Sequence, residues 1–172
     1  MSAAGSCFAD VFVFFAVAAM GVVLFVFDSP AVDYRWVALG GVLPLVEALT
    51  LRPLLLHTLL GSVLLMSIVM VLTVGRRLVR RRWLGVPIGS FVFLIVAGVW
   101  TRTELFWWPF AGLDGIAERP LPEYDRPLVV LVLLELAAVV AAVVLARRLG
   151  LDESANRRAF VRTGRVPSDR LR

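Results

Sequence analysis

The residues of this chain that could carry acid–base or metal chemistry are few and widely spaced. His57 is the only histidine, and isolated carboxylates stand at Glu47, Glu104 and Glu135 in or beside apolar segments. An imidazole and a carboxylate can share proton transfer, and both ligate divalent metals. One histidine with scattered glutamates is too weak a pattern to indicate a metal site. We therefore expect no bound metal and no other cofactor.

Other sequence features exclude several kinds of site. The chain has no glycine-rich phosphate loop, no Ser-His-Asp order and no cysteine metal cluster. The single cysteine, Cys7, excludes an intrachain disulfide. The net charge of +5 comes from 18 basic residues, all arginine, against 13 acidic ones. Because the arginines gather at the ends of apolar segments, they predict an oriented membrane protein and argue against a nucleic-acid partner.

The elements that must position these residues are apolar. Of the 172 residues, 60% are hydrophobic and the mean hydropathy is +0.87, whereas soluble domains are roughly 45–50% apolar. Long apolar runs predict an all-α, multi-pass transmembrane helical bundle in the cell membrane, with four to five membrane segments. The expected segments are Val11–Phe27, Trp36–Leu51, Leu54–Val74, Trp83–Trp100 and Leu128–Ala146.

The second segment has two interpretations. It contains Gly40-Gly41, Pro44 and Glu47, so it either spans with a kink or re-enters the same side, and the side of the N-terminus depends on which. The arginines of the loop 75–83 predict that this loop is cytoplasmic. Residues 1–150 are expected to form the transmembrane helical domain, and 151–172 a cytoplasmic arginine-rich tail, disordered beyond a short helical continuation.

Helix directions place the polar residues at one depth. His57, Glu47, Glu104 and Glu135 are all expected in the outer half of the membrane, which predicts a polar pocket that opens outward. Each has a structural alternative, since His57 and Glu135 could simply form hydrogen bonds between helices. The aromatic cluster at 106–110 fits either an interfacial belt or a wall over the pocket. Small residues four apart, such as Gly85 and Gly89, predict close helix packing.

Three stretches resemble a known family in order and spacing. They read "FDSPAVDYRWVALGGVLPLVEAL" at Phe27–Leu49, "LHTLLGS" at Leu56–Ser62 and "GVPIGSFVFLIVAGVWTRTELFWWPFAG" at Gly85–Gly112. They cover about half of the chain. The sequence resembles the membrane-bound metal-dependent hydrolases, a family that includes a LexA-regulated inner-membrane protein of enteric bacteria, and is most similar to its short actinobacterial members.

The resemblance implies metal-ligand positions that this chain has largely lost. His57 matches the histidine of the second stretch, but Phe93 and Ala97 stand where the third stretch of the family has His and Asp. Leu45 and Ala48 stand where the first has acidic residues. Phe93 and Ala97 are four residues apart, so they share a helix face. We expect that face to point at His57, with the aromatic ring in the volume of the lost metal.

Two functions follow as expectations. The first is a non-catalytic integral membrane protein with a hydrolase-like scaffold, which binds membrane lipids, a lipid-like ligand or another membrane protein. Its pocket would be lined by Phe93, Ala97, Trp100, Trp107, Trp108 and Glu135. The alternative is a membrane-embedded hydrolase that acts on an envelope lipid through His57 with Glu47 or Glu104. That alternative requires at least two carboxylates within hydrogen-bond reach of His57 or sharing one metal with it.

Overall fold

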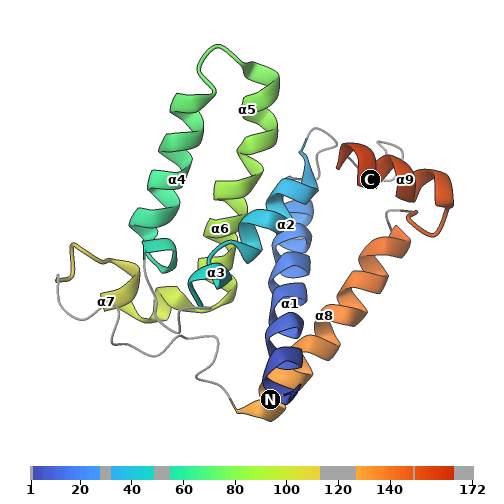
Figure 1. Ribbon diagram of the computed structural model, residues 1–172, viewed down its shortest axis with the longest axis horizontal. Helices are drawn as coiled ribbons and strands as arrows, with labels where there is room; N and C mark the ends of the chain where they lie inside the picture. Colours follow the sequence, from blue (N-terminus) through green and yellow to red (C-terminus); the bar gives the residue numbers. More distant parts are fainter. Residues whose placement is uncertain (1, 28–31, 49–54, 113–126, 149, 165–172) are drawn as a thin grey trace.

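Helices form every regular element in the part of the chain that the structure describes, and none of its residues is in a strand. The computed structural model describes residues 2–27, 32–48, 55–112, 127–148 and 150–164 (Figure 1). The α-helices and short 3₁₀ turns are α1 Ser2–Phe27, α2 Tyr34–Val42, α3 Leu45–Ala48, η1 Leu55–His57, α4 Leu59–Leu72, α5 Arg77–Trp83, α6 Gly85–Val96, η2 Val99–Thr101, α7 Thr103–Phe106, α8 Leu128–Arg148 and α9 Ser154–Thr163. The prediction of helices is confirmed.

The predicted transmembrane bundle is wrong. Over the described ranges, none of the helices combines the length and the apolar character that a bilayer crossing requires. The same finding contradicts the predicted multi-pass location in the cell membrane. One physical reason for the error is that two apolar runs, each predicted to be a single membrane-spanning helix, contain a shorter helix. The run 83–100 holds a helix of 12 residues, α6, and the run 54–74 one of 14, α4. At 1.5 Å per residue these are about 18 and 21 Å long, whereas a hydrocarbon core is about 30 Å thick.

The breaks occur where the local chemistry demands them. Pro44 separates α2 from α3, because proline has no backbone N–H to continue a helix. Gly98 follows α6 with φ of 74°, a left-handed conformation that glycine adopts without strain. Thr58 begins α4 as an N-cap, and its side chain accepts a hydrogen bond of 3.0 Å from the Gly61 amide. The predicted loop 75–83 is largely helical, as α5.

The α2–α6 pair has the most extensive helix contacts in the described fold. Glycines make the close approach possible, since a Cβ added to Gly89 would meet the backbone oxygen of Val37, and one added to Gly40 would meet that of Val86. A Cβ added to Gly85 would likewise meet Cβ of Trp36, so the predicted close packing through Gly85 and Gly89 is confirmed. A buried hydroxyl contact of 3.2 Å between Ser62 and Ser90 joins α4 to α6.

Two buried clusters organise the interior. The Phe93 cluster consists of Phe15, Leu45, Phe93, Leu94, Ala97, Val99 and Leu105. The Tyr34 cluster consists of Ala19, Val23, Tyr34, Val37 and Val92, and Leu145, Leu151 and Phe160 pack against it. Leu151 and Phe160, from the segment predicted to be a tail, thus pack against the helical core. In Figure 1, α1 and α8 begin together and diverge, with α9 near the wider end.

Candidate functional site

The single histidine is fixed by a carboxylate inside the protein. His57 ends η1 and none of its surface is exposed. Its Nδ1 lies 2.9 Å from Oε2 of Glu47, and Oε1 of Glu47 accepts a hydrogen bond of 2.8 Å from the Leu56 amide. The Glu47 side chain is only 11% exposed. Both carboxylate oxygens thus hold the chain around His57, and a ring N–H that donates to Glu47 fixes the tautomer.

Phe93 covers the imidazole from α6. The two rings lie edge to face, with centroids 5.5 Å apart and planes at 87°. Phe93 is almost fully buried and also packs on Phe15, with ring centroids 4.5 Å apart. The prediction that Phe93 points at His57 is confirmed. Ala97 is buried in the same cluster, one helical turn further along. An aromatic ring therefore stands beside the histidine where the resemblance implies a metal ligand.

The Glu47–His57 pair has the form of a base with its orienting acid. Such a pair activates a nucleophile or steadies a metal ligand in many enzymes. A general base must come within about 2.6–3.2 Å of the proton it removes, and the buried ring of His57 presents no surface to a substrate. Within the described ranges, no group of three or more His, Cys, Asp or Glu side chains could hold a metal ion. The arrangement joins two chain segments firmly, and that is its clearest physical effect.

The other predicted site residues lie in different surroundings. Glu104 is exposed, in contrast to the buried His57. Trp100 and Trp107 are about half exposed. Trp108 is partly buried, and its Nε1 is buried without a hydrogen-bond partner in the described part of the chain. The side chain of Glu135, which the sequence placed in the pocket, falls outside the described residues, as does that of Ala48.

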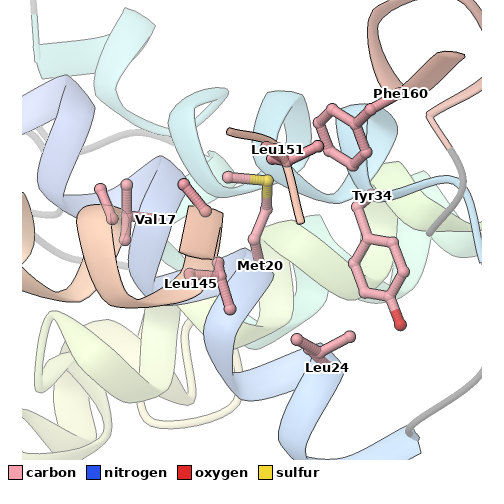
Figure 2. A pocket seen from close by; sticks show the side chains of 9 residues that line it. Val17, Met20, Leu24, Tyr34, Leu145, Leu151 and Phe160 are labelled. Carbon is pink, nitrogen blue, oxygen red and sulfur yellow. The ribbon is translucent and has the colours of Figure 1, made fainter. Parts of the chain in front are cut away.

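A pocket lies elsewhere, between α1, α8 and α9 (Figure 2). Its volume is about 80 Å³. Helix α1 contributes three side chains, α8 three, and the segment from Leu151 through α9 two, with Tyr34 of α2 completing the wall. The lining consists of Val17, Met20, Leu24, Tyr34, Ala142, Leu145, Ala146, Leu151 and Phe160. Only Tyr34 among these has a polar side-chain group, so the pocket suits an apolar guest.

Helix α9 is held over this pocket by two hydrogen bonds, which we call the α9 latch. The Tyr34 amide donates to the Gly164 carbonyl at 2.9 Å, and Nη1 of Arg35 donates to the Val161 carbonyl at 2.5 Å. Asp33 supports Arg35, since its Oδ1 lies 3.3 Å from Nε of that guanidinium. Gly164 ends α9 in a left-handed conformation, φ 67°, packed so closely that an added Cβ would meet Oδ1 of Asp33.

Sequence reasoning did not find this pocket. The signals were present at Leu151 and at Phe160-Val161, apolar residues within an otherwise polar, arginine-rich segment, and at Gly164, a typical helix terminator. Reading 151–172 as a tail hid the contribution of these residues.

Comparison of the chain with protein-family models, with curated proteins and with solved structures gave no match. The resemblance to metal-dependent hydrolases stays a prediction, and the geometry of the described residues carries the functional argument.

Proposed function

We propose that this chain is a non-catalytic binding protein that takes the apolar part of a small, lipid-like ligand into the pocket between α1, α8 and α9. The observation that carries the proposal is the composition of the wall, in which eight of nine side chains are apolar. Specific ligand sites are concave, largely apolar and few per protein. The proposal keeps the expected lipid-like ligand and moves its site away from Trp100, Trp107 and Trp108.

The size of the pocket limits the guest. A space of 80 Å³ holds on the order of six methylene-sized groups, if each takes the ~10–15 Å³ that one water needs. Burial contributes about 0.8 kcal/mol for each CH₂. The gross gain is then about 5 kcal/mol, which by itself corresponds to a dissociation constant of roughly a few tenths of a millimolar. Because the cost of immobilising the ligand must be subtracted, we expect dissociation constants of about a millimolar or weaker. A single alkyl chain fits this description better than a bulky ring system.

Helix packing favours a pocket that can adjust. Met20 lies in the wall, and its unbranched thioether adapts to guests of different shape (Figure 2). The wall is closed on one side by Phe160, a side chain of α9, and the α9 latch and apolar contacts help to hold this helix in place. Release of α9 would therefore admit a ligand without disturbing the Phe93 cluster.

The second candidate is a hydrolase centred on His57, and the hydrogen bond from His57 to Glu47 favours it. Such an enzyme would need Phe93 to move before a substrate could reach the imidazole. It predicts turnover of a short-chain ester that is abolished in His57→Ala and reduced in Glu47→Gln. The binding proposal predicts that wild type and both variants hydrolyse the ester at the uncatalysed rate.

The binding proposal is tested with octanol, a neutral single-chain probe, added to the full chain in isothermal titration. We expect saturable binding in the millimolar range. Ala142→Phe should fill the pocket and weaken binding at least tenfold, because Ala142 lines it. The matched control is Ala141→Phe, the same change at the neighbouring exposed position of α8, which should leave affinity unchanged.

Two results would overturn the proposal. One is an absence of saturable octanol binding by the folded wild-type chain. The other is equal loss of affinity in Ala142→Phe and Ala141→Phe, which would place the ligand on the outside of α8. Circular dichroism of each variant establishes that the helices are intact.

A further inference from the structure

Two exposed arginines flank the side chains that line the pocket. Arg148 follows Leu145 by three residues on α8, and Arg157 precedes Phe160 by three on α9. Residues three apart are neighbours on a helix surface. Leu145 and Phe160 both face the pocket, so each arginine stands beside a residue of its wall.

The side chains of these two arginines make no polar contact that holds the described part of the fold. Over the described residues, neither the Arg148 nor the Arg157 guanidinium has a hydrogen bond or ion pair. Two other arginines of the region differ in this respect, since Arg35 donates to the Val161 carbonyl and Arg158 donates to the Ser154 carbonyl. A guanidinium that does no structural work close to a pocket is available to a ligand.

The arginines near the pocket outnumber the acidic residues of the same segment. The segment 147–164 has five arginines and two acids, Asp152 and Glu153. Both acids are exposed, and Glu153 already accepts a hydrogen bond of 3.2 Å from the Asn156 amide group. An anion at the pocket edge would therefore meet a net positive surface.

We propose that the ligand is a single-chain amphiphile with an anionic head group, its tail in the pocket and its head bound by Arg148 and Arg157. This inference rests on the proposed function, because it assumes that the pocket takes the apolar tail. Guanidinium groups recognise carboxylates through paired, charge-assisted hydrogen bonds. A fatty-acid carboxylate is the simplest ligand that combines both features, and we commit to that chemistry.

The test compares octanoate with octanol on the full chain by isothermal titration at neutral pH and low ionic strength. The two probes share a tail and differ in the head group. We expect octanoate to bind about two- to fivefold more tightly than octanol, the range of a solvent-exposed ion pair. This preference should shrink at high salt, because exposed charges are screened.

Arginine variants locate the head group. Arg148→Gln and Arg157→Gln should each reduce the preference for octanoate and leave octanol affinity unchanged. Arg162→Gln is the matched control, because two residues beyond Phe160 its side chain lies on the opposite side of α9. It should leave both affinities as in wild type.

The outcomes separate this inference from the proposed function. Equal binding of octanoate and octanol, or a preference that survives both Arg148→Gln and Arg157→Gln, would overturn the anionic head while the apolar pocket stands. Loss of the preference in Arg162→Gln alone would likewise overturn the assignment of the two arginines. If neither probe binds, the pocket itself is not a binding site and both proposals fail.

Discussion

Oε2 of Glu47 lies 2.9 Å from Nδ1 of His57, and this contact connects α3 with the 3₁₀ turn η1 that precedes α4. The same carboxylate accepts from the Leu56 amide through its other oxygen. One side chain thus satisfies a buried ring and a backbone N–H. Because unpaired polar groups are costly in the interior, the pair fixes the position of His57 whether or not it does chemistry.

Two replacements of Glu47 should show whether its hydrogen bonds or only its side-chain volume stabilise the fold. Glu47→Gln keeps one oxygen acceptor, whereas Glu47→Leu leaves both the Leu56 amide and the His57 ring without this partner. We expect Glu47→Leu to lower the free energy of unfolding by about 1–3 kcal/mol more than Glu47→Gln does. Urea denaturation followed by circular dichroism measures the difference. Glu104→Leu is the exposed control and should change stability by about 0.5 kcal/mol or less. Equal effects of the two Glu47 variants would show that the pair is not needed.

Phe93 should be among the most sensitive positions of the interior. Its ring contacts both Phe15 and His57 and is 1% exposed. Phe93→Ala leaves a cavity between α1 and α6, and we expect a loss of about 3–5 kcal/mol. Phe91, on the same helix but 43% exposed, provides the control, since Phe91→Ala should cost about 1 kcal/mol or less. Comparable losses at the two positions, in thermal or urea unfolding, would contradict the placement of Phe93 in the core.

Two glycines should respond to alanine in opposite directions. A Cβ at Gly89 would meet the Val37 backbone oxygen, whereas one at Gly21, in the C-terminal third of α1, has no atom within 4 Å. Gly89→Ala forces α2 and α6 apart, and we expect destabilisation of about 1–3 kcal/mol. Gly21→Ala removes backbone freedom from the unfolded chain and should stabilise by about 0.5–1 kcal/mol. Melting temperatures moving in the same direction would contradict the close α2–α6 contact.

The α9 latch should be visible in hydrogen exchange. In Arg35→Ala the Val161 carbonyl loses its donor, so α9 should open more often. The amides of Tyr34 and Gly164, which donate to Gly164 and Phe160, should then exchange about five- to tenfold faster, the effect of roughly one hydrogen bond. Arg77→Ala, on the exposed α5, is the control. Unchanged exchange of the Tyr34 amide in Arg35→Ala would show that Arg35 does not hold α9.

Local sequence patterns predicted where helices form better than they predicted which helices pack against each other. Pro44 interrupts the second segment as its backbone chemistry requires, and Gly85 and Gly89 were rightly read as a packing surface. The break at Gly98 was not predicted, because the run 83–100 was taken as one segment. The contact between Phe93 and His57 followed from helical spacing and the family resemblance together. These are properties of short stretches, which a sequence encodes directly.

Long-range packing could not be predicted in this way. The wall of the pocket combines α1 with Leu145 and Phe160, residues more than a hundred positions further along the chain. The hydrophobic periodicity of a sequence does not indicate which helices pack against each other. Apolar runs indicated burial in a bilayer, because a run of apolar residues does not reveal whether its faces pack against lipid or protein. Many of the Val and Leu side chains of α4 and α8 are exposed in the structure, so apolar residue type alone did not predict their surroundings.

The measurement that tests the pocket most directly is methyl NMR of the full chain labelled at its methionines. Met20 lines the pocket, whereas Met70 lies on α4, which contributes nothing to the wall. A Met20→Leu variant assigns the resonance. On titration with octanol, the Met20 methyl should shift and saturate with the affinity found by calorimetry, and the Met70 methyl should stay in place. A Met20 signal that does not move while octanol binds, or an equal shift of Met70, would contradict the placement of the ligand between α1, α8 and α9.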